Sequence, residues 1–225
     1  MKFLEGDFFK LDFTEKFDGV ICDPPYKGVT ASNCPVEERL GELQFSIPAF
    51  MKKANDLTVD DSFLICFCNL QNGMDLCKYA GDNGWKFSTY QIWDKQPTRN
   101  WISWQMPLRH CELIFYFKKG NFKFDFRNGE VKKGVRRNSF GGKLKASKKN
   151  ESAVSYGMFQ EIVQFKLNNK LKVHPTEKPV DFSKMFAKIV GGETKKILDP
   201  FCGSGNLLSS FPNSIGIDLK NWRAQ

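Results

Sequence analysis

Asp23, Pro24, Pro25 and Tyr26 form the stretch whose residue types could do chemistry. They follow the apolar residues 19–21, so a buried strand is expected to end there in a stiff loop. Each proline fixes φ near about −65° and lacks an N–H, which leaves the Pro24 carbonyl outside any strand pairing. A carboxylate, a bare carbonyl oxygen and an aromatic ring suit the binding of a planar group with N–H donors on its edge. The alternative is an ordinary strand exit in which Asp23 only opens a turn.

A second stretch, residues 199–205, places two glycines between an expected strand and a short apolar helix at 206–211. Glycines let a ligand approach the backbone, and a helix N-terminus offers N–H donors. Asp218 ends the next expected strand, where an acid can accept hydrogen bonds from both ribose hydroxyls. The pattern predicts a nucleoside-bearing cofactor. A dinucleotide is not favoured, because Leu208 replaces the third glycine of its fingerprint. A mere tight turn is the alternative.

The elements expected to position these residues alternate between strands and helices. A short strand or turn is expected at 3–7. Helices are expected at 37–57, which Pro48 must kink or restart, at 71–80 ending at Gly81, and at 179–190 with Val180 among its apolar positions. Strands are expected at 17–22, 62–68, 85–93, 111–117, 196–199 and 214–218. This alternation predicts an α/β fold with a mostly parallel sheet.

Composition limits the class of protein. The 225 residues, 41% of them hydrophobic, suffice for one well-packed domain. No apolar run reaches the roughly 18–20 residues that span a bilayer, and acids at Glu5 and Asp7 come too early for a signal peptide. Seven cysteines without paired spacing are typical of a reducing compartment, and two histidines do not make a zinc pattern. We expect an intracellular protein without a metal.

The net charge of +9 is concentrated in one segment. Residues 118–150 contain 12 Lys or Arg and two acids, whereas the remainder carries 22 basic and 23 acidic residues. A basic segment on a near-neutral body favours a polyanion, usually nucleic acid. The alternative is a solvated run of charge. Because regular patterns are missing from 118 to 171, the segment is interpreted as an irregular, substrate-facing insertion.

Three motifs together resemble those of S-adenosylmethionine-dependent DNA amino-methyltransferases. They are residues 23–26 (Asp-Pro-Pro-Tyr), 174–179 (His-Pro-Thr-Glu-Lys-Pro) and 199–205 (Asp-Pro-Phe-Cys-Gly-Ser-Gly). Their order, with the catalytic motif before the cofactor loop, is similar to the β-class permutation of that family. Weaker similarities lie at Gly6-Asp7, 92–95 and 109–114.

The resemblance implies a Rossmann-like methyltransferase fold with helices on both faces of the sheet. In that fold, residues 1–117 would form the catalytic half, 118–172 a target-recognition insertion, and 173–225 the cofactor half of the same domain. Family members usually continue past the strand at 214–218 with a covering helix. Here, a partner subunit or residues 219–225 would cover that surface, or the enzyme would be a reduced form of the family.

The resemblance also implies a mechanism. In the family, the Asp-Pro-Pro-Tyr stretch holds the exocyclic amine of a base flipped out of the duplex, because a stacked amine cannot reach an in-line methyl donor. Asp23 and the Pro24 carbonyl would each accept an amine N–H, beside Pro25, and Tyr26 would stack on the ring. Two acceptors would aim the nitrogen lone pair at the methyl group, so that catalysis is mainly positioning plus electrostatics.

The implied cofactor is S-adenosylmethionine. Phe201, Gly203 and Gly205 would wrap its methionine end, and Asp218 would bind the ribose. Thr176 and Lys178 would bind its carboxylate, and Asp7 would lie near the adenine. The remaining expected cofactor contacts are Cys22, Asp23, His174, Asp199 and Ser204. His174, Lys178 and Phe201 each have a purely structural alternative.

The implied substrate is duplex DNA. Asp23 favours adenine N6, because serine is common at this position in cytosine-N4 enzymes. Lys132, Lys133, Arg136 and Arg137 are expected to contact phosphates. The alternatives are a cytosine-N4 enzyme, an RNA methyltransferase, and a catalytically inactive DNA-binding relative. The family further suggests a homodimer, in the cytoplasm of a bacterial or phage-infected cell.

Overall fold

An eight-stranded mixed sheet forms the centre of the computed structural model, which describes residues 1–25, 45–95, 111–128, 161–165 and 177–220. The strand order is β1-β8-β7-β2-β3-β5-β4-β6. The strands are β1 (Lys2–Glu5), β2 (Phe17–Cys22), β3 (Thr58–Cys68), β4 (Lys86–Asp94), β5 (Cys111–Lys118), β6 (Ile162–Val163), β7 (Ile197–Asp199) and β8 (Ile215–Asp218).

Most of the strand pairs are parallel. β1, β8, β7, β2 and β3 run in one direction, β5 is antiparallel to both β3 and β4, and β6 is parallel to β4. In consequence, β2, β3 and β4 end at the edge of the sheet where β5 begins. The predicted α/β fold with a mostly parallel sheet is confirmed.

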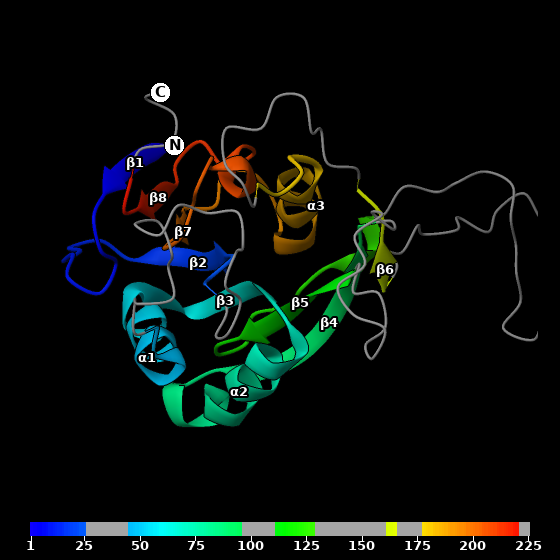
Figure 1. The fold of residues 1–225 in the computed structure, drawn as a ribbon, viewed down its shortest axis with the longest axis horizontal. Coiled ribbons are helices and arrows are strands. Elements are labelled where there is room, and N and C mark those ends of the chain that lie inside the picture. The colour runs from blue at the N-terminus through cyan, green and yellow to red at the C-terminus, as the bar shows by residue number, and fades with distance from the viewer. Residues whose placement is uncertain (26–44, 96–110, 129–160, 166–176, 221–225) are drawn as a thin grey trace, which may run out of the picture.

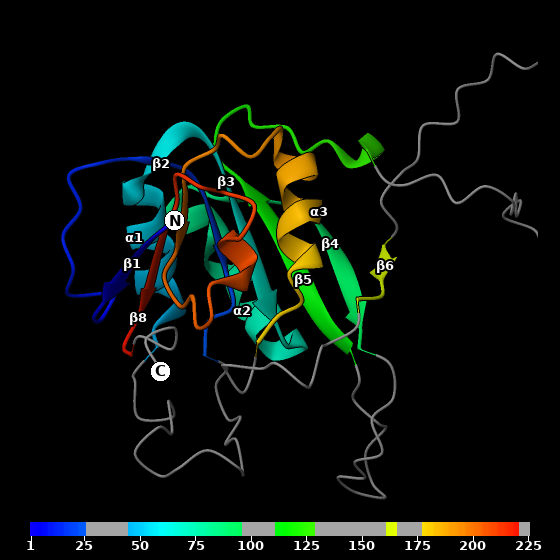
Figure 2. The ribbon, with the colours of Figure 1, turned by 90° about the horizontal axis from the view of Figure 1, so that it is seen from above.

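Helices cover both faces of the sheet (Figure 1). α1 (Ile47–Leu57) and α2 (Leu70–Ala80) lie on one face, and α3 (Asp181–Val190) lies on the other. In the view from above, α3 lies over β3 and β5 (Figure 2), where Phe186 packs edge-on against Phe67 and Tyr116. None of the described helices has the length and apolarity to cross a membrane.

The core has two halves, one under each layer of helices. β2 and β3 contribute to both, because alternate side chains point to opposite faces. Cys66 and Cys68 share the α1–α2 side, whereas Phe63, Ile65 and Phe67 share the α3 side, and all five are fully buried. The apolar run at 62–68 is therefore a strand covered on both faces, as predicted.

The structure confirms some of the predicted helix boundaries and corrects others, for local reasons. α1 begins at Ile47, because Ser46 is its N-cap and Pro48 occupies its first turn. Of the two effects predicted for Pro48, a kink or a restart, the structure shows a helix start; residues 37–44 lie outside the described part. α2 ends at Ala80 with Gly81 as its C-cap, as predicted. The 3₁₀ turn η3 (Gly81–Asn83) follows directly, and Gly84, at φ 77°, reverses the chain. Val180 precedes α3 and is 40% exposed.

The predicted insertion contains ordered contacts in two described stretches, 119–128 and 161–165. Phe122, Phe124 and η4 (Phe126–Asn128) follow β5 and pack under α3, where the Asp125 N–H donates to the Ile189 carbonyl at 2.8 Å. Residues 161–165 return to the sheet through β6, and the Trp93 indole donates to the Phe165 carbonyl at 3.1 Å. Residues 129–160 and 166–172 of the insertion lie outside the described part.

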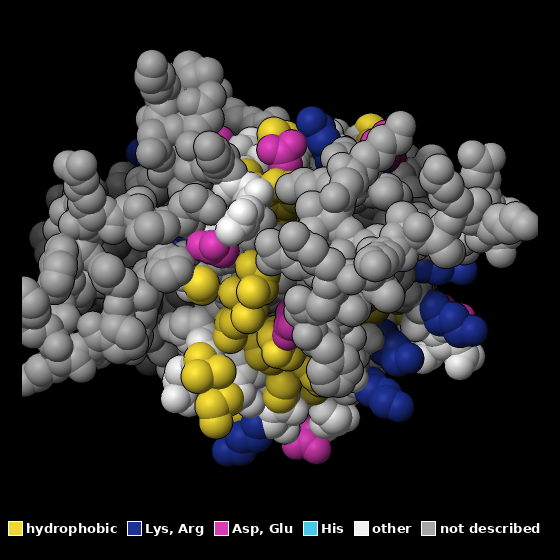
Figure 3. Space-filling model, turned by 90° about the vertical axis from the view of Figure 1, so that its right-hand side faces the viewer, with side chains coloured by type: hydrophobic (Ala, Val, Ile, Leu, Met, Phe, Trp, Pro, Cys, Tyr) yellow, Lys and Arg dark blue, Asp and Glu magenta, His cyan; other side chains and the backbone are white. Residues whose placement is uncertain are grey.

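The outer side of β4 carries exposed apolar side chains (Figure 3). Phe87 and Tyr90 pack at tilted angles against Phe115 of β5, with ring centroids 5.5 and 6.2 Å apart, yet remain 39% and 41% exposed. Leu70 and Met74 are the most exposed apolar residues of neighbouring α2. Among the described residues, α2 therefore leaves part of this face open.

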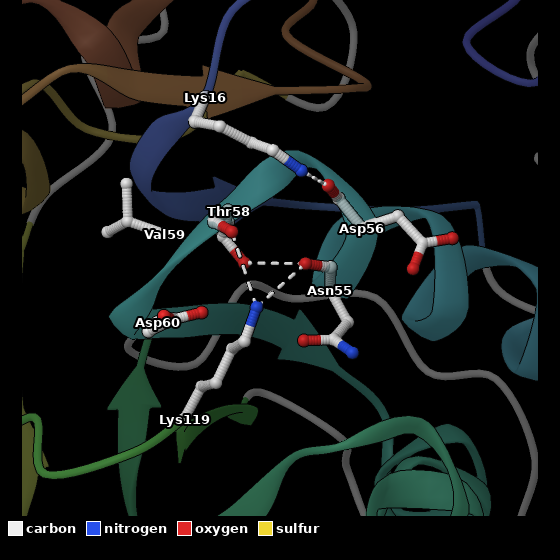
Figure 4. Close-up of a pocket in the computed structure, with 7 residues that line it drawn as sticks. All are labelled: Lys16, Asn55, Asp56, Thr58, Val59, Asp60 and Lys119. Atoms are coloured by element: carbon white, nitrogen blue, oxygen red, sulfur yellow. Dashed lines mark hydrogen bonds between the residues drawn. The ribbon is translucent and has the colours of Figure 1, made fainter.

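The C-terminal end of α1 lies in an open pocket at the edge opposite to the ends of β2 and β3 (Figure 4). The last turn of α1 contains no basic residue of its own. The ammonium groups of Lys16 and Lys119 supply this charge, the first by donating to the Asp56 carbonyl and the second by donating to the carbonyls of Asn55 (3.0 Å) and Thr58 (3.3 Å). Cations at a helix C-terminus satisfy free carbonyls and oppose the helix dipole. The pocket is explained by helix capping.

Replacing Lys119 by Met should lower the free energy of unfolding by about 1 kcal/mol, because it removes this charge and keeps the alkyl stem. Urea unfolding followed by circular dichroism measures the change. Lys52→Met, which breaks an exposed pair with Asp56, is the control and should change stability less. Equal effects of the two variants would contradict the capping role.

Candidate active site

Four acidic residues lie at the carboxyl ends of parallel strands. Asp199 and Asp218 end β7 and β8, Asp23 directly follows β2, and Asp7 lies two residues beyond β1. The carboxyl ends of parallel strands meet at one edge of the sheet, where α/β proteins bind ligands. Asp23 and Asp218 both act electrostatically on Asp199. Two motifs far apart in the sequence thus meet at one site.

The acid of the Asp-Pro-Pro stretch is held at the end of a buried strand. β2 lies between β7 and β3, and Cys22, its last residue, is fully buried. Pro24 is buried as well, while the Asp23 side chain keeps 17% of its surface exposed. The carboxylate therefore sits at the rim of the core on a rigid support.

Lys178 is the main partner of Asp23. Its side chain is only 6% exposed, and its ammonium donates to Asp23 Oδ2 and lies 3.3 Å from Glu112 Oε2. The other Glu112 oxygen accepts a hydrogen bond from Lys95 at 2.8 Å. The rings of Phe67 and Trp93 flank the Lys178 ammonium, with centroids at 5.1 and 6.0 Å. We call Asp23, Lys178, Glu112 and Lys95 the charge chain.

The contacts in the charge chain favour the charged forms of Lys178 and Glu112. Burial alone would lower the pKa of Lys178, but the carboxylates of Asp23 and Glu112 outweigh it and raise that pKa. Burial would likewise raise the pKa of Glu112, yet the ammonium groups of Lys178 and Lys95 lower it. Opposite charges within a few ångströms favour the charged forms in this way.

Asn206 joins the segment of Lys178 to the glycine loop. It opens the 3₁₀ turn η5 (Asn206–Leu208), and its Nδ2 donates to the Lys178 carbonyl at 2.9 Å and to Glu177 Oε1. The short helix predicted at 206–211 is therefore wrong, since only a single 3₁₀ turn forms there. This turn offers no open α-helix N-terminus. The side-chain amide of Asn206 instead holds residues 177–178 in place.

The glycine loop folds back on β8. Gly203 and Gly205 adopt φ values of 48° and 75°, in the left-handed region that favours glycine. The Gly203 N–H donates to Asp218 Oδ2 at 2.8 Å, and the Cys202 N–H donates to the Ile217 carbonyl at 2.8 Å. A Cβ on Gly216 would lie 2.8 Å from Cys202 Sγ, so β8 must be bare at that point. The loop backbone and the Asp218 carboxylate face each other.

Phe201 and Asp7 lie beside this loop. Phe201 is half-buried and packs against Phe45, Phe50 and Phe8, with ring centroids 5.5, 5.9 and 6.2 Å apart. Asp7 Oδ1 accepts the Phe9 N–H at 2.9 Å, which shapes the turn after β1. Both residues are thus anchored in the local fold.

Asp199 is fully buried, and its Oδ1 accepts the Phe201 N–H at 3.0 Å. Burial raises the pKa of this carboxyl well above its ordinary range. Its other oxygen has no hydrogen-bond partner among the described residues, which fits a neutral acid. Asp199 thus stabilises the backbone of the glycine loop from its buried side.

Part of the predicted site lies outside the described residues. Tyr26, His174 and Thr176 belong to this part, as do the four basic residues Lys132, Lys133, Arg136 and Arg137. The structure brings together Asp7, Asp23, Phe201, Asp218 and the loop containing buried Ser204. Within the described ranges, no three His, Cys, Asp or Glu side chains come together as metal ligands would.

Comparison with known proteins agrees with this geometry. The N6/N4 methyltransferase family, described as DNA methylase, matches residues 17–221. The chain belongs to this family of DNA methylases. A comparison with curated protein sequences gives no match.

The fold of this methylase is also similar to solved structures. The M1.HpyAVI–SAM complex shares 20% identity with it at a TM-score of 0.64, over 98% of this chain and 94% of that chain. TTHA0409 of Thermus thermophilus, complexed with S-adenosyl-L-methionine, shares 16% identity at a TM-score of 0.62, over 100% and 91% of the two chains. The Rossmann-like methyltransferase fold is thereby confirmed.

Three residues of the methylase site were missed as site residues in the sequence. Glu112 and Lys95 fall in the weaker similarities at 109–114 and 92–95, which gave no reason to pair them. Asn206 directly follows Gly205, but a polar residue at that place predicts no particular partner. Their roles come from contacts between segments far apart in the chain.

Replacing Asp199 by Asn should change how stability depends on pH. A carboxyl whose pKa is raised by folding binds its proton more tightly in the native state, so its contribution to stability declines as pH rises above the unfolded value of about 4. Asn cannot ionise and can still accept from Phe201. In urea unfolding, the free energy of unfolding of the variant should therefore equal that of the wild type near pH 4 and exceed it increasingly toward pH 8. Exposed Asp12→Asn is the control, and a pH-independent difference for Asp199→Asn would contradict the buried acid.

Proposed function

We propose that this methylase transfers a methyl group from S-adenosylmethionine to the exocyclic N6 amine of an adenine in DNA. The observation that carries the proposal is the Asp23 carboxylate, fixed by Lys178 at the same sheet edge as the glycine loop and Asp218. Family membership supports DNA methylation, and Asp rather than Ser at position 23 favours adenine over cytosine.

The residues present fit S-adenosylmethionine. Gly203 and Gly205, both left-handed, leave the loop backbone open to a ligand, and Asp218 is an acid at the ribose-binding place beyond β8. Phe201 offers an aromatic wall, and Thr176 is proposed for the cofactor carboxylate. Two similar structures, M1.HpyAVI and TTHA0409, are complexes with this molecule. It would supply an electrophilic methyl group, whose C–S bonding electrons stay on sulfur while the substrate amine forms the new bond and loses a proton.

The chain's own residues would prepare the amine. Asp23 and the Pro24 carbonyl would accept its two N–H groups, and Tyr26 would stack on the base. A delocalised aromatic amine is a poor nucleophile, so two acceptors that pull it toward tetrahedral geometry lower the barrier. Lys178 was predicted to hold the cofactor carboxylate; its contacts with Asp23 and Glu112 favour a role beside the acid instead.

The substrate would be duplex DNA with the target base flipped out. Lys132, Lys133, Arg136 and Arg137 are proposed as phosphate contacts, in keeping with the charge of their segment. A homodimer, and a site of action in the cytoplasm of a bacterial or phage-infected cell, remain predictions.

The first test is transfer of labelled methyl from S-adenosylmethionine to unmethylated DNA, with RNA beside it, followed by nucleoside analysis. We expect N6-methyladenine in DNA. Asp23→Asn, which keeps the side-chain shape, should lower the transfer rate by a factor on the order of 10² to 10³, as the loss of one preorganised polar group does. Exposed Asp56→Asn is the matched control. N4-methylcytosine, methylated RNA, or DNA binding without transfer would each replace the proposal by the corresponding alternative.

A second test concerns the cofactor alone. Asp218→Asn should raise the dissociation constant for S-adenosylmethionine about tenfold, because one carboxylate acceptor for the ribose is lost and the Gly203 contact is weakened. Isothermal titration calorimetry measures the change. Glu5→Gln removes a charge from the residue opposite Asp218 on β1 and should leave affinity unaltered. Equal affinity in Asp218→Asn would exclude the ribose role.

A further inference from the structure

Glu112 is a charged member of the site that the proposed reaction does not use. It stands near the start of β5, at the edge where β2, β3 and β4 end, and its side chain is 17% exposed. Its two oxygens contact different lysines, Lys178 at 3.3 Å and Lys95 at 2.8 Å. Among the described residues, Glu112 is the second anion on the buried ammonium that pairs with Asp23.

We propose that Glu112 is a positioning residue for methyl transfer, which shares the Lys178 ammonium with Asp23 and so fixes how Asp23 presents its carboxylate to the substrate amine. This inference rests on the proposed function. Glu112 acts through Lys178.

The contacts give the reason for this sharing. An ammonium group has three donors, and here one donates to Asp23 Oδ2 while the charge is also drawn toward Glu112. Without the Glu112 charge, Asp23 would be the one remaining carboxylate of these two to attract Lys178. The lysine would then compete more strongly with the substrate amine for the same carboxylate.

Stability alone is a weak reason for such an arrangement. Taking charges out of water costs several kcal/mol per ion, and apolar residues often replace buried pairs without loss. Here the Lys178 ammonium lies against the rings of Phe67 and Trp93, which could also enclose an apolar side chain. The charges instead gather beside the acid proposed to bind the amine.

The titratable groups around Lys178 determine the pKa of its ammonium group. They are Asp23 after β2, Glu112 on β5 and Asp199 on β7, with Lys95 behind Glu112. The nearby thiols of Cys22 and Cys68 are neutral, because burial raises their pKa values. Removing the Glu112 charge should lower the pKa of Lys178, whereas removing the Lys95 charge should raise it, since Lys95 then no longer offsets Glu112.

Two variants of the full chain test the proposal in opposite directions. In Glu112→Gln, we expect the single-turnover rate of methyl transfer to DNA to fall by about tenfold or more, equivalent to about 1.4 kcal/mol of barrier. We expect affinity for S-adenosylmethionine to stay within about twofold. On the alkaline limb of the pH–rate profile, Lys178 loses its proton and no longer fixes Asp23. This limb should therefore move to lower pH in Glu112→Gln and to higher pH in Lys95→Met. Glu15→Gln, which breaks an ion pair with Lys196 away from this edge, is the matched control and should behave as wild type.

Three results would overturn the proposal: an unchanged rate in Glu112→Gln, a loss of rate matched by an equal loss of cofactor affinity, or shifts of the alkaline limb in the same direction in both variants. Wild-type chain that transfers no methyl to DNA would contradict the proposed function instead. In that case, the pKa of Lys178 is measured directly by titration of its carbon-13 Cε resonance, assigned by its loss in Lys178→Arg. Equal pKa values in wild type and Glu112→Gln would then refute the sharing of Lys178.

Discussion

A buried ammonium group must have anions beside it, and the site of this methylase is arranged around that requirement. Lys178 is almost fully enclosed, and among the described residues the carboxylates of Asp23 and Glu112 stabilise its charge. These three residues come from the segment before α3, from the end of β2 and from the start of β5. The pairing therefore fastens three distant parts of the chain together at the point where the acid of the Asp-Pro-Pro stretch emerges.

The direction of the strands makes this meeting inevitable. Parallel strands deliver their carboxyl ends to one edge, and the antiparallel β5 brings its amino end to the same edge. Asp218 and the glycine loop arrive beside Asp23 by the same rule. Asn206 then ties the loop to the backbone of Lys178, so that the proposed cofactor side and the proposed amine side share one support.

Much of this could be predicted from the sequence, because it is encoded locally. The apolar run before Asp23, the continuous apolar strand at 62–68 and the glycines after Asp199 each predict their own structure. What could not be predicted depends on partners far apart in the chain. Nothing near Glu112 indicates that it faces Lys178, and nothing near Asn206 indicates that its amide reaches the Lys178 carbonyl. The error at Val180 has another cause, since a residue next to a proline at a helix start can lie either just before the helix or in its first turn.

Two described stretches of the basic insertion, 122–126 and 161–165, are attached to the fold, and this limits how changes between them affect the site. Residues 122–126 pack under α3, and residues 161–165 are joined to β4 through β6 and the Trp93 indole. The sequence between these two anchors can be lengthened, shortened or exchanged while the sheet edge that holds Asp23 keeps its shape. The two anchors hold this sheet edge through contacts that do not involve the residues between them. Under the proposed function, a change of target sequence would therefore need substitutions between the anchors only, with the residues around Asp23 unaltered.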